Sequence, residues 1–154
     1  MSAAPTALTQ RMPRPSAAAR PLAKANYELL AAWRHALRRF HRFSREEARA
    51  AGLSPQQHQV LLAIKGFPGR DYVSVGELAE KLQLRHHSAV GLVDRLARRQ
   101  LVRRQLSSTD RRRQEIRLTA QGERLIGRLS AAHLRELKQL RPELRRLLAA
   151  MPGE

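Results

Sequence analysis

The residues of this chain that could do chemistry on a partner are basic and lie between Lys81 and Arg117. This stretch of 37 residues holds eleven Lys and Arg side chains against three acidic ones, a net charge of +8 (11 − 3). Neutralising phosphates gives affinity for nucleic acid of any sequence, because each contact releases a counterion. A lone run of charge is more often a solvated surface, so nucleic acid is favoured only if folded elements present the charges together.

The first segment that could read DNA is the start of a helix predicted over residues 87–99. Its exposed residues are expected to include His86, His87, Ser88, Gly91 and Arg95. Histidine donates to or accepts from a base edge, or donates to phosphate when protonated. The alternative is an exposed histidine pair that only caps the helix. A zinc site is less favoured, because neighbouring helical residues point about 100° apart and chelate one ion poorly.

Gly91 stands in the middle of this predicted helix. Glycine there costs about 1 kcal/mol relative to alanine. Its presence predicts a close approach, either of DNA or of another helix.

The second segment is the turn SSTDRRR at residues 107–113, whose arginines suit the negative potential of a narrow minor groove. We expect Asp110 to form an ion pair with Arg112 that shapes the loop. Strand alternation would put Arg111 and Arg113 on the other side, where one of them contacts DNA. Ordinary surface arginines are the alternative.

Nothing in the sequence is typical of a catalytic or cofactor site. There is no glycine-rich phosphate loop, no paired carboxylates at catalytic spacing, and no histidine cluster that would bind a metal. Cysteine is absent, which excludes disulfides and thiolate chemistry, and no apolar run approaches the roughly 18 to 20 residues of a membrane span. With 154 residues and a net charge of +17, the chain is predicted to be a binding protein without cofactor, metal or membrane partner, and not an enzyme.

The elements that must position these segments are mostly helical. Apolar residues three and four apart, from Leu29 to Phe43, predict a long first helix that begins near Pro21 and ends at Gly52. Ser54 begins a second helix with Pro55 in its first turn.

Around the two basic segments the pattern predicts a helix, a turn, a helix and a hairpin. Ser74 with Glu77 has capping-box spacing and begins the first of these helices. Residues 101–106 and 114–118 alternate in type around the SSTDRRR turn, which is typical of a hairpin. Thr119 caps another long helix, and we expect Pro142 to begin a final short one.

In this order the segments resemble the MarR family of winged-helix transcription regulators. The resemblance covers about residues 22–150 and departs from the family at Gln100, where a glycine usually ends the recognition helix, and at His86-His87, where Ser or Thr types are usual. It rests on LSPQQHQVLLAI (53–64), LAEKL (78–82), LVDRLARRQLVRR (92–104), Asp110-x-Arg112, and Leu118-Thr119 followed by Gly122.

The resemblance implies a mainly α fold: a winged helix-turn-helix with a small β-hairpin wing over residues 53–119, and N- and C-terminal helices that form a dimerisation base. Those helices would occupy residues 21–52 and 120–150, and composition predicts a disordered basic arm at residues 1–20. The implied partner of each copy is a second copy of itself. The expected dimerisation residues are Leu22, Leu29, Leu137, Leu144 and Leu148.

The resemblance further implies a homodimeric, sequence-specific DNA-binding regulator in the bacterial cytoplasm and nucleoid, most often a repressor, acting on a pseudo-palindromic operator. A small aromatic or carboxylate effector would relieve it, in a pocket near Trp33, Phe40 and His58. Ordinary core aromatics are the alternative for these three residues. Two other functions remain open: a nucleic-acid-binding architectural protein without sequence preference, and a winged-helix adaptor that binds another protein.

Overall fold

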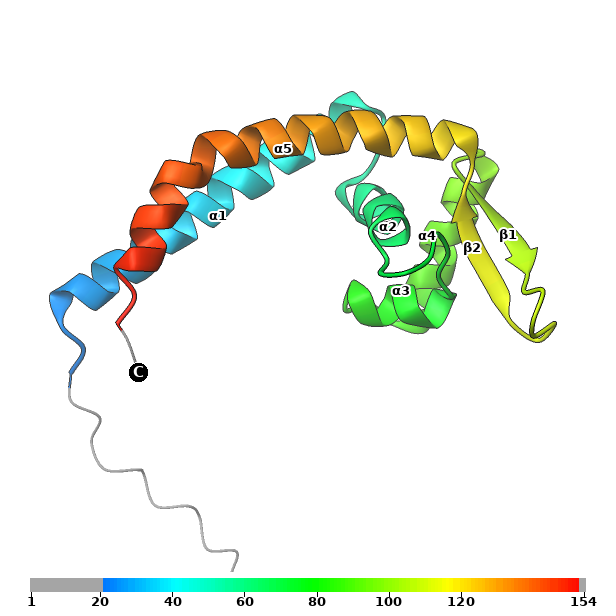
Figure 1. Cartoon of the computed structure of the whole chain (residues 1–154), viewed down its shortest axis with the longest axis horizontal. Helices are drawn as coiled ribbons and strands as arrows, with labels where there is room; N and C mark the ends of the chain where they lie inside the picture. The colour runs from blue at the N-terminus through cyan, green and yellow to red at the C-terminus, as the bar shows by residue number, and fades with distance from the viewer. Residues whose placement is uncertain (1–20, 153–154) are drawn as a thin grey trace, which may run out of the picture.

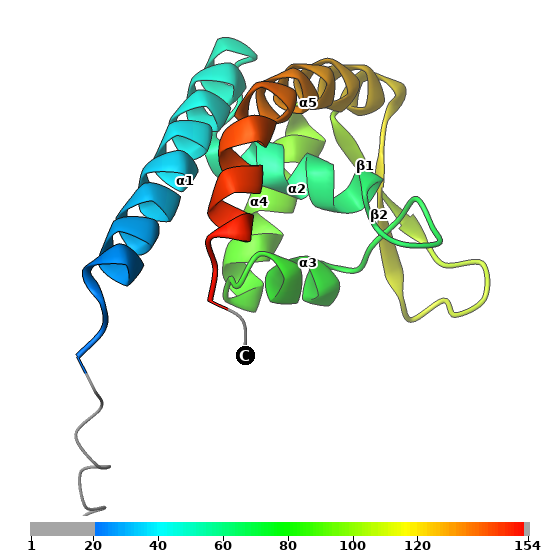
Figure 2. The ribbon, with the colours of Figure 1, turned by 60° about the vertical axis from the view of Figure 1, so that its left-hand side comes forward.

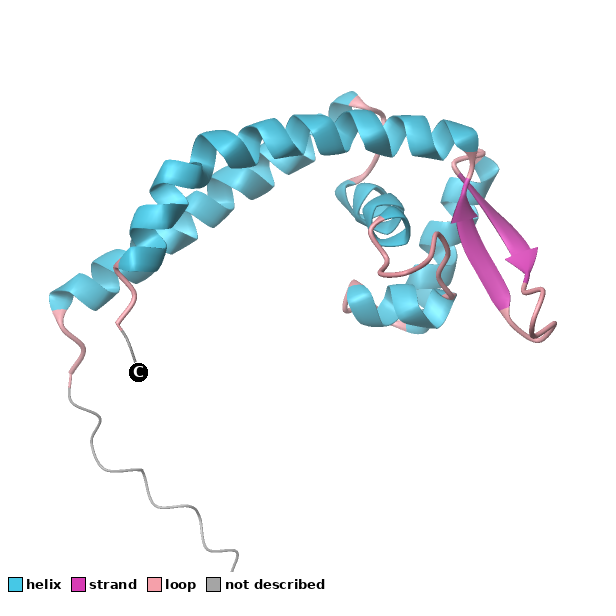
Figure 3. Ribbon diagram, in the orientation of Figure 1, coloured by secondary structure: helices cyan, strands magenta, loops and turns pink. Residues whose placement is uncertain are grey.

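The computed structural model describes residues 21–152, so the arm predicted at residues 1–20 lies outside the described part. The long helices α1 and α5 pack against each other, and the shorter elements lie to one side of them (Figures 1 and 3). Among residues 21–152, no helix combines the length and apolar character needed to cross a bilayer. The elements are α1 (Lys24–Ala50), α2 (Pro55–Lys65), α3 (Val75–Lys81), α4 (His86–Arg98), β1 (Val102–Leu106), β2 (Gln114–Leu118) and α5 (Ala120–Ala149).

The N-caps predicted from the sequence are confirmed. The Ser54 hydroxyl accepts from the Gln57 N–H at 3.1 Å, and the Gln57 side chain accepts from the Ser54 N–H at 3.0 Å. Ser74 and Glu77 form the same reciprocal pair, and the Thr119 hydroxyl accepts from the Gly122 N–H. Each cap satisfies N–H groups that a helix start leaves without a partner, so each fixes where its helix begins.

The core of the molecule lies between α2, α4, β2 and the first half of α5. α4 buries the four residues of the predicted stripe, Ala89, Leu92, Val93 and Leu96. Burial of this stripe sets the rotation of α4, and the opposite face is therefore turned outward.

The expectation that Pro142 begins a separate helix is wrong, because α5 runs unbroken from Ala120 to Ala149 with Pro142 inside it. A proline in a helix interior removes one backbone hydrogen bond and usually costs about 3 kcal/mol. Here its ring lies on the exposed face, while Leu140 and Leu147 on either side are buried. An ion pair of 3.0 Å between Arg39 and Glu143 also holds this part of α5 to α1, so packing outweighs the local preference.

Helices α3 and α4 both end on a glutamine with left-handed backbone, at φ 53° for Gln83 and φ 58° for Gln100. After α4, the Leu101 N–H donates to the Leu96 carbonyl at 3.0 Å, and the Gln100 N–H donates to the Ala97 carbonyl at 2.9 Å. This is the bonding pattern that a glycine usually completes. Gln100 therefore closes the helix in the usual way, at the cost that left-handed backbone carries for a residue with a side chain.

A short extended segment after α2 attaches the hairpin to the rest of the fold. Val73 pairs with Ile116 of β2 through two backbone hydrogen bonds, of 3.1 and 2.7 Å. On the opposite side of the hairpin, an ion pair of 2.5 Å between Arg104 of β1 and Asp94 joins it to α4. The hairpin is thus held from both strands.

A stack of alternating rings and guanidinium groups reinforces the first of these attachments. The Arg70 guanidinium carbon lies 4.3 Å from the Phe67 ring centre and 4.7 Å from that of Tyr72. The Arg117 guanidinium carbon lies 4.6 Å from the Tyr72 ring centre. Glu77 forms an ion pair with Arg70, so the stack joins the loop after α2 to α3 and to β2.

A cluster of aromatic rings fills the junction of α1, α2 and α5. The ring centre of His133 lies 4.7 Å from that of His58, 5.9 Å from that of Phe40 and 5.3 Å from that of Phe43. Since a carbonyl only accepts, Nδ1 of His133 donates to the Leu129 carbonyl at 2.7 Å, which leaves Nε2 to accept from the Ser44 hydroxyl at 2.9 Å when the ring is neutral. Burial, and then the neighbouring His133, lower the pKa of His58.

We predict that Tyr72→Ala frees the hairpin from the loop after α2. It removes two cation–π contacts, each worth about 0.5 to 1 kcal/mol, so a modest loss of stability is expected. Trypsin should then cut faster after Arg111, Arg112 and Arg113, as followed by mass spectrometry. Tyr72→Phe keeps the ring and should be cut at the wild-type rate; equal rates for all three proteins would show that the stack does not hold the hairpin.

We predict that the free energy of unfolding falls in mild acid because of His58. Its pKa in the folded protein is below the ordinary value of 6.5, so the unfolded chain binds the proton more readily. The stability from neutral His58 is present above about pH 6.5 and is lost as the pH falls through the lowered pKa. Urea unfolding at pH 7.5 and 5.5 should show a smaller difference for His58→Gln than for wild type, whereas the exposed His86→Gln should behave as wild type.

Candidate nucleic-acid interface

The exposed face of α4 carries five of the residues predicted to contact DNA. His86, His87 and Arg95 are exposed, while Ser88 and Gly91 are half-buried. The N-cap of α4 is Arg85, and no side chain of the described residues donates or accepts a capping hydrogen bond there. The histidine pair therefore does not cap the helix, and its rings remain available at the start of α4.

Gly91 lies under the side chain of Arg95, one turn further along the same face. A methyl group added at Gly91 would lie 3.4 Å from Nη1 of Arg95 and would meet no other residue within 4 Å. Close packing of a second helix is therefore not why this position lacks a side chain. The glycine leaves room for the Arg95 guanidinium to lie flat along the helix.

The loop of the hairpin, the wing tip, is built around the buried hydroxyl of Ser107. This hydroxyl accepts from the Thr109 N–H at 3.3 Å and from the Asp110 N–H at 3.4 Å. The Ser107 N–H donates to the Arg113 carbonyl at 2.9 Å, which closes the loop. Sequence reasoning missed Ser107 as the centre of the loop, although Ser and Thr are known to form such local turns.

The predicted ion pair between Asp110 and Arg112 is wrong. The Asp110 carboxylate accepts from the backbone N–H of Arg112 at 3.0 Å, and its side-chain partner is Arg113, at a loose 3.9 Å. The premise of strand alternation was also wrong, because Arg111 and Arg112 lie in the turn before β2. Turn geometry brings the side chain of Arg113, three residues after Asp110, toward the Asp110 carboxylate. Arg111 and Arg112 are exposed, and neither has a carboxylate within 4 Å among residues 21–152.

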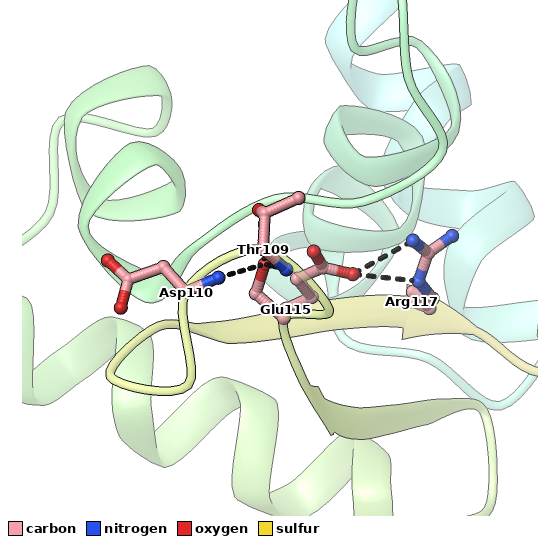
Figure 4. Close-up of polar contacts among 5 residues, drawn as sticks. Thr109, Asp110, Glu115 and Arg117 are labelled. Carbon is pink, nitrogen blue, oxygen red and sulfur yellow. Dashed lines mark hydrogen bonds and ion pairs between the residues drawn. The ribbon is translucent and has the colours of Figure 1, made fainter.

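Ion pairs divide the arginines around α4 and the wing into two groups. In one group, Arg104 forms an ion pair with Asp94, and Arg117 forms one with Glu115 (Figure 4). Glu115 is only 7 % exposed, so this pair is an internal support and not a surface for a partner. Around α4 and the wing, the exposed arginines of residues 21–152 that form neither an ion pair nor a side-chain hydrogen bond are Arg85, Arg95, Arg98, Arg103, Arg111 and Arg112.

Of these, Arg85, Arg98, Arg103 and Arg112 were not among the residues predicted to contact DNA. Arg85 directly precedes α4, and Arg103 lies on β1, whose last four residues are all exposed. The position of Arg85 before a predicted helix start was a usable signal. The exposure of β1 was harder to predict, because its last residue, Leu106, is apolar and is still 59 % exposed.

The start of α4 and the wing tip lie on the same side of the molecule, away from α5. In Figures 1 and 2, the turn from α3 to α4 and the far end of the hairpin both lie below the arch of α5. A helix fits the major groove, about 12 Å wide, and arginines of a loop fit the narrower minor groove beside it. The arrangement can therefore offer base-edge donors and phosphate-binding cations to one face of a duplex.

The three residues expected around an effector do not line one pocket. Phe40 and His58 both pack against His133, where the rings contact one another. Trp33 lies seven residues before Phe40 on α1, which is about 10 Å along a helix. Its indole Nε1 is buried and has no hydrogen-bond partner among the described residues.

Residues 51–113 match a family model described as MarR family. No protein with a curated description matches the chain. Among solved structures, a MarR family protein from Bacillus stearothermophilus is 26 % identical with a TM-score of 0.67, over 76 % of this chain and 79 % of that one. A point mutant of MepR from Staphylococcus aureus, bound to an oligodeoxyribonucleotide, is 19 % identical with a TM-score of 0.63, over 82 % of this chain and 98 % of that one.

AbsC, a MarR family transcriptional regulator from Streptomyces coelicolor, is 20 % identical with a TM-score of 0.61 and covers 85 % of this chain and 99 % of its own. The matched residues 51–113 include α2, α3, α4, β1 and the wing tip, which together form the helix-turn-helix and hairpin described above. The order of the elements, the family match and these structures agree. Residues 51–113 therefore form a winged helix-turn-helix that matches the MarR family.

Proposed function

We propose that this protein is a homodimeric, sequence-specific DNA-binding regulator of transcription, acting in the bacterial cytoplasm. The start of α4 would enter the major groove, where His86, His87 and Ser88 meet base edges, and the wing tip would reach the neighbouring minor groove. The observation that carries the proposal is the set of exposed, unpaired arginines that surrounds these two segments on one side of a MarR-family winged helix. A protein with this fold, the MepR mutant, has been seen bound to an oligodeoxyribonucleotide.

Base reading and phosphate binding would fall to different residues. Arg85 directly precedes α4, Arg95 lies in its last turn and Arg103 lies on β1. All three are exposed and suit phosphate contacts, which fix the register on the duplex. In the wing, Arg111 and Arg112 are unpaired, and the loosely paired side chain of Arg113 is 78 % exposed, so all three remain candidates for the minor groove. This division follows the general rule that phosphate contacts position a protein while base contacts specify the sequence.

The two long helices would form the dimer. A single copy leaves apolar side chains uncovered on α1, on α5 and just before α1, with Leu22, Leu137 and Leu148 exposed by 54, 39 and 57 %. Leu29 and Leu144 are half-buried next to them. Two copies joined here would meet two half-sites about one helical turn of DNA apart, as a pseudo-palindromic operator requires.

Repression relieved by an effector is the mode of regulation we propose. The unpaired indole N–H of Trp33 supports a ligand near α1, because a buried donor without an acceptor costs free energy that a ligand oxygen would recover. An aromatic carboxylate could supply both the acceptor and the apolar contact. Binding would alter the relation of α1 to α5 and so change the distance between the two copies of α4.

Two sets of substitutions should separate sequence reading from phosphate binding. We predict that His87→Ala with Ser88→Ala lowers affinity for DNA upstream of the gene by about 1 to 3 kcal/mol per lost base contact, and leaves affinity for scrambled DNA unchanged. A triple substitution of the wing arginines to glutamine, at Arg111, Arg112 and Arg113, should weaken binding to both DNAs. It should also reduce the salt slope by about 0.9 for each lost phosphate contact. Fluorescence anisotropy across a salt series measures both, with Arg145→Gln on the far end of α5 as the control.

Two outcomes of that experiment would contradict the proposal. Equal wild-type affinity for both DNAs would favour an architectural protein without sequence preference. No binding to either DNA at low salt would favour a winged-helix adaptor for another protein.

Dimerisation has its own test. We predict that Leu137→Glu with Leu148→Glu yields a monomer by light scattering, because two carboxylates would be buried in the interface. Loss of the second half-site should lower operator affinity by about 10² to 10⁴. Leu62→Glu is the matched control, since Leu62 is 46 % exposed but lies on α2; a dimeric double variant would refute the assignment of these leucines.

A further inference from the structure

The outer face of α1 carries a straight row of arginines, which we call the α1 basic stripe. Its members are Arg34, Arg38, Arg45 and Arg49, and all four are exposed. Because each residue of a helix turns by about 100°, these four positions fall within about 60° of rotation. At a rise of 1.5 Å per residue, the stripe extends about 22 Å along the helix axis.

The arginines of the α1 basic stripe have no acidic partners. Among residues 21–152, no carboxylate lies within 4 Å of any of the four guanidinium groups, whereas the neighbouring Arg42 forms an ion pair of 2.9 Å with Glu46. The stripe contains two pairs of arginines four residues apart, a spacing at which like charges destabilise a helix. The stability of α1 therefore gives no reason for this arrangement of charge.

The stripe lies opposite the face through which α1 packs in the fold. The ring centres of Phe40 and Phe43 lie 5.9 and 5.3 Å from that of His133 on α5. Both phenylalanines are about 150° of rotation away from the middle of the stripe. Figure 2 shows α1 on one side of α5, with α3, α4 and the hairpin on the other side. The stripe therefore faces away from the surface formed by α4 and the wing.

The proposed dimer leaves the stripe uncovered. Leu30 and Leu37, exposed by 56 and 44 %, are apolar side chains of α1 that a second copy would cover. They lie about a quarter of a turn to one side of the stripe. Burial of four unpaired guanidinium groups in the interface would carry a large cost in desolvation. We therefore expect the stripe to remain in contact with solvent in the dimer.

The composition of this face favours the phosphate backbone of a duplex over other anionic surfaces. Between residues 34 and 49, the only further side chains on the same face are His41 and Arg42. A helix that lies on a membrane needs an apolar face, and binding of single strands relies on aromatic rings that stack on bases. A straight row of cations suits a rigid duplex, which carries one charge per about 1.7 Å of its axis.

We propose that the α1 basic stripe binds the phosphate backbone of a second DNA duplex, without reading its sequence, while the winged helix-turn-helix holds the first. DNA is favoured over an acidic protein because the winged helix-turn-helix brings the molecule to DNA, and this step rests on the proposed function. The two surfaces face in different directions, so one dimer would join two segments of DNA. The protein would then link DNA segments as well as recognise one of them.

The test is capture of one duplex by another through the full-length protein. DNA from upstream of the gene is fixed to beads, loaded with protein and washed, and a fluorescent duplex of scrambled sequence is then added. Wild type should retain the fluorescent duplex on the beads. We expect Arg38→Gln with Arg45→Gln to lower this capture about tenfold at about 0.1 M salt, because two phosphate contacts are lost. Arg38→Lys with Arg45→Lys keeps both charges and should capture as wild type.

The matched control removes the same charge elsewhere. Arg145 and Arg146 are exposed near the end of α5, and the change of both to glutamine should leave capture at the wild-type level. Affinity for the upstream duplex alone, from fluorescence anisotropy, should be the same for all these proteins. Light scattering and thermal unfolding should show that the Arg38/Arg45 glutamine variant remains a folded dimer.

Three outcomes would overturn the proposal. Capture at the wild-type level by the Arg38/Arg45 glutamine variant would mean that the second winged helix of the dimer holds the second duplex. No capture by wild type would mean that the stripe does not bind DNA. Pelleting with phosphatidylglycerol vesicles that depends on Arg38 and Arg45, without capture of DNA, would mean a membrane surface.

Failure of the proposed function gives a different result. Wild type would then bind the upstream and scrambled duplexes with equal affinity. Capture that still depends on Arg38 and Arg45 would support the stripe in that case, and would refute only the sequence-specific regulator.

Discussion

The fold depends on one corner of backbone, where the end of α4, the start of β1 and the start of α5 meet at Leu101. The Leu101 N–H closes α4, and its carbonyl accepts from the Thr119 N–H at 3.1 Å. The Thr119 hydroxyl donates to the Gln100 carbonyl at 2.6 Å and accepts from the Gly122 N–H. A side chain at Gly122 would lie 2.1 Å from the Leu101 carbonyl oxygen, so only glycine allows this approach. Because no flexible linker separates α4 from α5 at this corner, the direction of α5 determines the direction of α4.

Local patterns predicted most of the elements, because local physics decides them. A capping box depends on four consecutive residues, and the buried stripe of α4 depends on a period of 3.6, so Ser54, Ser74 and Leu92 could be placed correctly from the sequence. Pro142 could not, because its tolerance depends on Leu140, Leu147 and the Arg39–Glu143 ion pair, which lie beyond the range of local preference.

The candidate site was predicted less completely than the fold for the same reason. Which arginine pairs with Asp110 depends on the geometry of a turn, and that geometry favoured Arg113 over Arg112. The sequence also showed a net charge without showing which charges are neutralised. Only the folded chain brings Asp94 to Arg104, and so distinguishes an arginine that supports the wing from one, such as Arg103, that is free for a partner.

Trp33 is the one tryptophan of the whole chain, and its indole sits on α1, the helix that would meet both a second copy and an effector. Indole emission responds to the polarity around the ring and to hydrogen bonding at its N–H. The tryptophan fluorescence of this protein therefore comes from a single ring with an unpaired N–H in the proposed dimerisation base. Emission from Trp33 therefore reports on the surroundings of α1, and it does not report on the wing or on α4.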